Sequence, residues 1–266
     1  MSLNELPDVL LGIVCEYVEL KPMKYLDWVS KLMNPKSVVC DKLSMNPNAV
    51  DILEKNLHRV NKYLLIQNPN AVHIFEANPH LISWTWLPFN PNAIHLLEAN
   101  KDKIEWKYLS SNPNAIHLLE ANLDKICWNS LSVNSNAIHL LEANPDKIDW
   151  QMLSKNPKAI HLLEANPQKI DWSYLGMNPN AIHLLKANRN ELSQIYLHHN
   201  PNAIELLTEN YDAIRWIDLH SNSNSVELFK NNQDKFNPDL ISGNPGFFTV
   251  DTQKWNARKK QWMSQI

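Results

Sequence analysis

Histidine and glutamate recur together along this chain, and both side chains can ligate metal ions. Six histidines follow one another at intervals of 22 residues, and five of them are followed by a glutamate three residues later. The histidines are His73, His95, His117, His139, His161 and His183, and the glutamates are Glu76, Glu98, Glu120, Glu142 and Glu164. A His-x-x-Glu pair on one helix supplies only two ligands, and packed helices lie about 8–10 Å apart, too far to complete a zinc site between them. We therefore predict a solvated polar stripe with contacts between residues three apart, and no metal or other cofactor.

The motifs of common enzyme active sites are missing from the sequence. It contains no Gly-x-Gly-x-x-Gly segment, no Gly-Lys-Ser/Thr phosphate loop, no Gly-x-Ser-x-Gly and no His-Glu-x-x-His. Serine, histidine and aspartate occupy repeated positions, whereas catalysis usually needs one asymmetric constellation. We expect no catalytic residues, and hence a protein that is not an enzyme.

The interval of 22 residues extends far beyond the histidines. An asparagine recurs ten times at this interval without insertion or deletion, at Asn46, Asn68, Asn90, Asn112, Asn134, Asn156, Asn178, Asn200, Asn222 and Asn244. A fixed period of this length is typical of stacked repeats. Each copy is named by its first residue, and its residues are numbered from position 1, the recurring asparagine.

Each copy predicts two short helices. Asn-Pro-Asn at positions 1 to 3 places a favoured N-cap before a proline at the first helical position, and the apolar residues that follow predict a helix of about ten residues. Asparagine at position 11, from Asn56 through Asn232, predicts a left-handed residue that ends this helix. A second, shorter helix is predicted from position 17, as in copy 134, where Asp149 would cap it and Trp150 and Leu153 would face the core.

Helices this short are marginal alone, so each copy must be held by its neighbours. The chain is predicted to be an all-α solenoid of about nine to ten two-helix repeats with helical caps at both ends. We expect an N-terminal helical cap with a shortened repeat over residues 1–45, tandem repeats over 46–243, and a partial repeat with a cap helix over 244–266.

The repeated asparagines and tryptophans are interpreted as structural. Asparagine carries both a donor and an acceptor, so stacked copies can satisfy the backbone of the turns and one another. Tryptophan at position 17 keeps register with leucine at position 20 and is expected in the core.

Variation between copies is more informative about partners, because packing demands are nearly equal in every copy while a partner's surface is not. Positions 18, 19 and 22 change freely and are rich in aromatic residues and methionine, which are enriched at interface hot spots. The candidate partner-binding stripe consists of Trp86, Phe89, Tyr108, Met152, Tyr174, Met177 and Tyr196. The alternatives are neutral drift on an exposed face and partial burial between short helices.

Charge and composition exclude several classes of partner. The net charge of −3 supplies no basic field for nucleic acid. No apolar run is long enough to span a membrane, and we see no signal peptide. Three scattered cysteines, Cys15, Cys40 and Cys127, fit a reducing compartment, so we expect an intracellular protein. The sequence decides neither the identity of a protein partner nor the oligomeric state.

The amino-acid sequence of the repeat resembles that of a known family. Asn-Pro-Asn-Ala-Ile-His-Leu-Leu-Glu-Ala-Asn-Pro-Asp-Lys-Ile-Asp-Trp, followed by Leu-Ser, is similar to the tandem repeat of many largely uncharacterised proteins of giant DNA viruses, over about residues 46 to 243. The copies with Lys62, Gln194 and Pro238 lack the tryptophan. The resemblance implies a virus-encoded protein that acts in an infected host cell, in its cytoplasm, and it carries no catalytic residues.

The N-terminus is similar to the start of an F-box, a helical module that docks onto a Skp-type adaptor of a ubiquitin ligase. The similarity rests on Leu6, Pro7, Leu10, Leu11 and Ile13, which would contact the adaptor. A plain N-terminal cap is the alternative. We therefore expect a non-enzymatic scaffold for protein–protein interaction, with a substrate-recognition subunit of a ubiquitin ligase and a structural or virion assembly component as alternatives.

Overall fold

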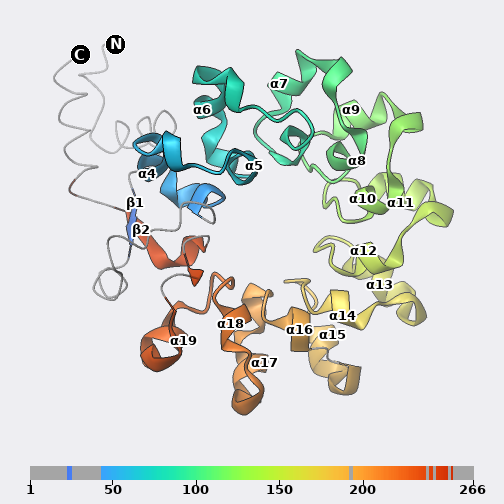
Figure 1. Cartoon of the computed structure of the whole chain (residues 1–266). Helices are drawn as coiled ribbons and strands as arrows, with labels where there is room; N and C mark the ends of the chain where they lie inside the picture. Colours follow the sequence, from blue (N-terminus) through green and yellow to red (C-terminus); the bar gives the residue numbers. More distant parts are fainter. Residues whose placement is uncertain are drawn as a thin grey trace, which may run out of the picture.

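The computed structural model describes residues 23–25, 43–191, 194–237, 240–241, 244–250 and 253. Over these residues the chain forms pairs of short helices that recur with the sequence repeat and curve into a ring (Figure 1). The predicted all-α solenoid is confirmed.

The helices form two concentric layers. Helices that begin at position 5 lie on the outside of the ring, and helices that begin at position 17 lie on the inside (Figure 1). The outer helices are α4 (Val50–Glu54), α6 (Val72–Ala77), α7 (Ile94–Glu98), α9 (Ile116–Glu120), α11 (Ile138–Ala143), α13 (Ile160–Ala165), α15 (Ile182–Ala187), α17 (Ile204–Thr208) and α19 (Val226–Asn231). The inner helices are α5 (Lys62–Leu65), α8 (Trp106–Leu109), α10 (Trp128–Ser132), α12 (Trp150–Ser154), α14 (Trp172–Leu175), α16 (Gln194–Leu197) and α18 (Trp216–Leu219).

The core runs round the ring between the two layers. It is built from alanine at position 4, an apolar residue at position 8 and leucine at position 20, and these side chains are fully buried in copy 134 as Ala137, Leu141 and Leu153. Because copies 46 to 200 all contribute these three groups, the apolar column continues from one copy to the next; copy 222 has Ser225 at position 4 and Ile241 at position 20. No copy could bury these side chains alone, which explains why such short helices are stable in the array.

The first helix of each copy begins later than the sequence predicts. In copy 200 the proline lies in a separate 3-10 turn, η12 (Pro201–Ala203), and the α-helix begins only at Ile204. The Asn200 side chain accepts from the backbone N–H of Asn202 at 2.9 Å, and the Asn200 carbonyl accepts from Ala203 N at 3.1 Å. These bonds close a tight turn of their own, so the predicted helix of about ten residues is replaced by a turn and a helix of five or six residues.

The end of this helix also differs from the prediction. No described residue has a positive φ, so the asparagine at position 11 is not left-handed. Asn100 instead has φ −138°, and its side-chain amide donates to the Leu96 carbonyl at 2.9 Å. The side chain thus satisfies a carbonyl at the end of the helix directly, and a short 3-10 turn follows, here η7 (Lys101–Lys103).

The second helix follows the prediction. The Asp149 carboxylate accepts from the backbone N–H of Met152 at 3.0 Å and caps α12. Leu153 is fully buried, and Trp150 is half-buried against the core.

Two strands join the ends of the described array. β1 (Met23–Tyr25) pairs antiparallel with β2 (Phe248–Val250), in the register Met23 to Val250 and Tyr25 to Phe248. This extended segment differs from the helical ends that the sequence predicts. Copy 244 begins like the others, with the turn η16 (Pro245–Phe247), and then continues into β2 where earlier copies continue into a helix.

Most of the two predicted caps lies outside the described residues. Residues 1–22 and 26–42 belong to the N-terminal part, and residues 251–252 and 254–266 belong to the C-terminal part. The candidate adaptor-docking residues also lie outside the described residues; they are Leu6, Pro7, Leu10, Leu11 and Ile13. Across the described part of the chain, the short helices include none that is both long and apolar enough to cross a bilayer.

Candidate interaction surface

The asparagine at position 1 locks each copy to its neighbour. Asn178 is fully buried; its side-chain amide donates to the carbonyls of Asn156 at 2.8 Å and Ser154 at 3.0 Å, and its side-chain oxygen accepts from Asn180 N at 3.0 Å. The same amide donors reach the preceding copy from Asn68 through Asn244. The predicted asparagine ladder is therefore confirmed at position 1, where it fixes the spacing of the copies.

A second row of asparagines, at position 3, closes the ring. Asn92 donates to the carbonyl of Pro69 in the preceding copy at 2.9 Å, and the bond recurs at most junctions. Asn48, in the first full copy, makes the same bond to Pro245 of the last copy at 3.1 Å. The array thus joins its own end as though copy 244 preceded copy 46.

Position 21 supplies a third connection between copies. The Ser132 hydroxyl donates to the Trp128 carbonyl at 2.8 Å and accepts from Asp149 N of the next copy at 3.0 Å. His220 does the same with two nitrogens: Nδ1 lies 2.7 Å from the Trp216 carbonyl and Nε2 accepts from Asn237 N at 2.8 Å. This geometry assigns the proton of the neutral ring to Nδ1.

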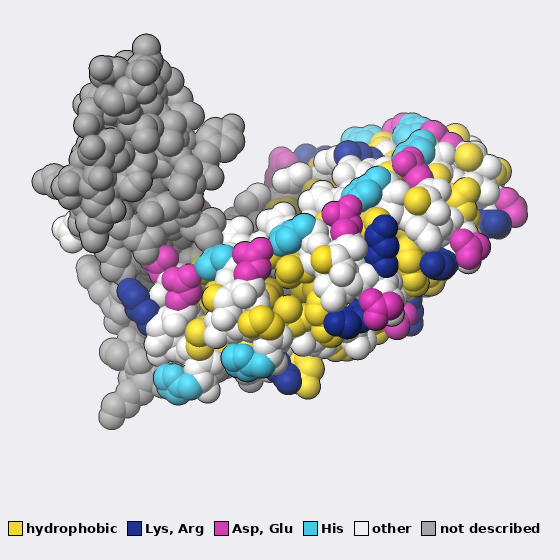
Figure 2. All heavy atoms as spheres, turned by 90° about the horizontal axis from the view of Figure 1, so that it is seen from above, with side chains coloured by type: hydrophobic (Ala, Val, Ile, Leu, Met, Phe, Trp, Pro, Cys, Tyr) yellow, Lys and Arg dark blue, Asp and Glu magenta, His cyan; other side chains and the backbone are white. Residues whose placement is uncertain are grey.

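The histidine–glutamate stripe follows the outer helices, and its contacts differ from those predicted. Each histidine pairs with the glutamate of the preceding copy, with Nε2 to Oε1 distances of 2.7 to 3.0 Å, and not with the glutamate three residues later. Imidazoles and carboxylates alternate along the surface (Figure 2). Among the described residues, no group of three or more His, Cys, Asp or Glu side chains is placed to hold a metal ion. The stripe is a chain of exposed histidine–glutamate contacts that links successive copies.

Tryptophan at position 17 is shared between core and surface. Its ring is half-buried against the core, and in regular copies a lysine from position 14 of the next copy covers the exposed side. Lys125 Nζ lies 4.7 Å from the centre of the Trp106 ring, a cation–π contact between neighbours. The prediction that this tryptophan belongs to the core is correct for one side of the ring.

The candidate partner-binding stripe lies on the inner layer of the ring. Its position 19 residues, Trp86, Tyr108, Met152, Tyr174 and Tyr196, are all half-buried. At position 22, Met177 is half-buried as well, whereas Phe89 is 38% exposed. Partial burial, one of the alternatives considered for these positions, therefore describes six of the seven candidates.

The structure brings three of the candidates together. The rings of Trp86 and Tyr108 are stacked with centroids 5.0 Å apart, and Phe89 lies 4.7 Å from Tyr108 and 6.0 Å from Trp86. Contact between these rings fixes their orientation at the surface. This group is called the aromatic stack.

Two further candidates form a separate pair. The ring centroids of Tyr174 and Tyr196 are 5.3 Å apart, and Lys155 Nζ lies 5.4 Å from the centre of the Tyr174 ring. Ser130 and Met152 occupy position 19 between this pair and the aromatic stack, so the rings do not form one continuous row. The sequence already shows this interruption, and the structure adds which of the remaining rings contact each other.

Three further exposed residues lie at the same positions and were not among the candidates predicted from the sequence. Tyr63 and Ile217 at position 18 are 52% and 64% exposed, and Met45 lies at position 22. Together with Phe89 they are four of the six large hydrophobic side chains that are exposed in the described structure. Extending the rule for positions 18 and 22 to copies 46 and 200, and to the residue directly before copy 46, would have found them.

Comparison of the chain with protein-family models, with curated proteins and with solved structures finds no match.

Proposed function

We propose that the ring is a non-enzymatic scaffold that binds another protein through positions 18, 19 and 22 of its inner layer. The observation that carries the proposal is the aromatic stack of Trp86, Phe89 and Tyr108, whose rings hold one another while Phe89 stays exposed. Rings that are ordered before binding lose little conformational freedom in a complex, which is why such residues are frequent among interface hot spots.

The distribution of exposed apolar groups supports the same surface. Core positions are almost invariant from copy to copy, whereas Met45, Tyr63, Phe89 and Ile217 expose apolar area at positions that the packing does not require to be apolar. Large exposed hydrophobic side chains that share repeat positions indicate an interaction surface more strongly than scattered ones. Specificity would come from the sequence of side chains along the inner layer, which differs in every copy.

The proposal includes the setting in which the scaffold acts. The repeat sequence resembles that of giant DNA virus proteins. This resemblance supports a virus-encoded protein that acts in the cytoplasm of an infected host cell. A partner would then be a viral or a host protein. This part of the proposal rests on the resemblance alone.

The test compares a stripe variant with a matched surface variant. The full chain would be used to capture proteins from infected-cell extract, alongside Tyr63→Ser/Phe89→Ser and the control Leu123→Ser. Leu123 is 54% exposed but lies at position 12, outside the stripe, so the control also removes exposed apolar area. We expect a protein that binds the wild type and Leu123→Ser and is lost from the stripe variant. A protein that binds all three equally would place the interface elsewhere.

A further inference from the structure

The junction between copies 178 and 200 departs from the regular repeat at two positions that contact each other elsewhere. Tryptophan occupies position 17 in six copies, but here the residue is Gln194. The lysine that covers this tryptophan comes from position 14 of the next copy, and here that residue is Ala213. At four regular junctions the lysine Nζ lies 4.3 to 4.7 Å from the tryptophan ring centre. Copy 178 and copy 200 have thus lost both members of the pair.

A cavity of about 240 Å³ lies at this junction. Leu197, Leu207 and Ile214 give it an apolar floor, and Ala213 lies in its wall. Arg189 and Glu209 contribute charged groups to the lining. The volume is below the range of about 300–1,000 Å³ that is common for drug-sized ligands, which suits a single bicyclic ring.

The cavity occupies the place that the tryptophan fills at other junctions. The Trp216 ring, at position 17, lies 5.6 Å from the ring of Phe229 at position 8 of the following copy. The Trp128 ring lies under Lys147 at position 14 of the following copy. Leu207 and Ala213 hold positions 8 and 14 in copy 200, and both line the cavity. Two independent contacts of the regular repeat therefore converge on the same space.

A second junction without the tryptophan carries a larger residue at position 14. Copy 46 also lacks it, with Lys62 at position 17, but position 14 of the next copy is Leu81, which packs against the core. At the junction of copies 178 and 200 the corresponding residue is the small Ala213. The two junctions thus differ in the size of the residue at position 14.

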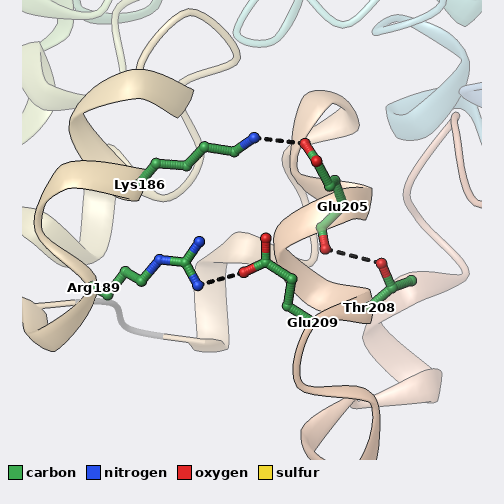
Figure 3. Close-up of polar contacts among 5 residues, drawn as sticks. All are labelled: Lys186, Arg189, Glu205, Thr208 and Glu209. Carbon is green, nitrogen blue, oxygen red and sulfur yellow. Dashed lines mark hydrogen bonds and ion pairs between the residues drawn. The ribbon is translucent and has the colours of Figure 1, made fainter.

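Two ion pairs hold this junction together. Lys186 at the end of α15 pairs with Glu205 of α17 at 2.6 Å, and Arg189 pairs with Glu209 (Figure 3). The Arg189 guanidinium is planar and can stack on an aromatic ring, as lysine does over tryptophan at regular junctions. The Glu209 carboxylate can accept a hydrogen bond from a ring N–H. The lining thus offers an apolar floor, a planar cation and an anionic acceptor.

We propose that this cavity binds an indole-type ring supplied from outside the chain. The ring would replace the tryptophan that is absent from position 17 of copy 178, with Leu207 and Ile214 beneath it and Arg189 and Glu209 at its edge. Two sources have this chemistry, a small aromatic molecule and the tryptophan side chain of a partner protein. The proposal is independent of the inner-layer stripe, because the two sites use different residues.

The experiment titrates the full chain with indole and with N-acetyl-tryptophanamide, by calorimetry and by saturation-transfer NMR. The filled variant Gln194→Trp/Ala213→Lys restores the pair found at regular junctions, and we expect it to bind indole at least tenfold more weakly and to have a higher Tm. Ala213→Leu copies the residue found at Leu81 and closes the cavity without a new tryptophan, in case the double variant folds poorly. The matched control is Glu191→Lys, which places the consensus lysine against Trp172 at a junction that keeps its tryptophan; its indole affinity should equal that of the wild type.

The outcomes separate the two sources. Binding of both probes to the wild type supports a partner's tryptophan side chain, because the amide carries a backbone on the ring. Binding of indole alone supports a small aromatic molecule. The proposal is overturned if neither probe binds the wild type, or if the variants that close the cavity bind indole as well as the wild type does.

Discussion

Lys186 Nζ lies 2.6 Å from Glu205 Oε2 and occupies the place that a glutamate holds at the six preceding junctions. At those junctions position 9 carries the acid and position 6 of the next copy carries the imidazole. Here position 9 carries the base and position 6 the acid, so the pair has reversed its direction. Either change alone would have brought two like charges or two basic groups together.

The reversed pair predicts how charge changes at this junction combine. Lys186→Glu should lower Tm by about 1–2 °C, because it places two carboxylates side by side on an exposed surface. Lys186→Glu/Glu205→His should recover most of that loss, because it recreates the pair found at His183 and Glu164. Thermal denaturation of the two variants and of Glu205→His alone completes the cycle. Equal losses for the single and double charge changes would contradict the pairing.

The same pair predicts a pH dependence. The hydrogen bond from Lys186, with the attraction of its charge, holds the pKa of Glu205 below its ordinary value of 4.5. Since the folded-state pKa is the lower one, the contribution of Glu205 is present above pH 4.5 and is lost as the pH falls through the lowered pKa. The difference in Tm between wild type and Glu205→Gln should therefore shrink between about pH 6 and about pH 3. Glu191→Gln, a change at an exposed carboxylate on the neighbouring turn, serves as the control, and a difference that stays constant with pH would argue against the pair.

The buried and exposed asparagines of one copy should differ in their contributions to stability. Asn178→Ala should cost about 2–4 kcal/mol, because it removes the side-chain donor from the buried carbonyls of Ser154 and Asn156, of which the Asn156 carbonyl keeps its bond from Ala159 N. Asn180→Ala removes one exposed bond, to Pro157, and should cost less than about 1 kcal/mol. Chemical denaturation of the two variants measures the contrast. Similar costs would mean that the ladder at position 1 does not carry the stacking.

Closure of the ring can be tested at Asn48 and Gly246. Asn48→Ala removes the bond to Pro245, whereas Asn92→Ala removes the equivalent bond at an interior junction. We expect hydrogen exchange of the β1 and β2 amides to accelerate in the first variant and not in the second. Gly246→Ala should have a larger effect, because its Cβ would lie 2.2 Å from the Ser223 carbonyl oxygen. Unchanged exchange in all three variants would show that the ends do not depend on this contact.

His220 and the serines at position 21 perform the same task, which predicts an unusual tolerance. His220→Ser should keep both hydrogen bonds but lose the packing of the ring against Phe229 and Phe236, whose ring centres are 4.3 and 6.0 Å away, at a cost of about 1–2 kcal/mol. His220→Leu fills the space but leaves the Trp216 carbonyl and the Asn237 amide without a partner on this side chain, and should cost about 2–4 kcal/mol. Denaturant unfolding ranks the two variants; a leucine variant more stable than the serine variant would contradict this account.

Local structure could be predicted from the sequence wherever one copy contains all the determining residues. The Asp149 cap and the buried Leu153 both follow from spacing and hydrogen-bonding capacity. The way in which the asparagine at position 11 ends the first helix could not be predicted. An asparagine can end a helix by adopting a left-handed backbone conformation, or its side chain can donate to the carbonyl four residues earlier. The sequence does not distinguish these two solutions, and the structure uses the second.

Features that depend on how several copies pack together could not be predicted from the sequence. The bond between Asn48 and Pro245 depends on the small rotation at every junction, which no single copy reveals. The candidate stripe was predicted by position, but its rings meet only where aromatic residues fall in adjacent copies, as at Trp86 and Tyr108. The cavity beside Ala213 likewise required knowing which position of one copy contacts which position of the next.

The bond that joins the last copy to the first has a consequence for how such a protein can change. An open solenoid can gain or lose a unit at either end, and the remaining units still stack. A chain whose ten asparagine-led copies return to their own beginning has no such freedom, because one extra unit would carry Pro245 past Asn48 and turn the circle into a spiral. Repeat arrays usually vary in length by duplication and deletion of units. Here either event would disrupt the contact that closes the ring, and the number of copies could change only if the curvature of every copy changed with it.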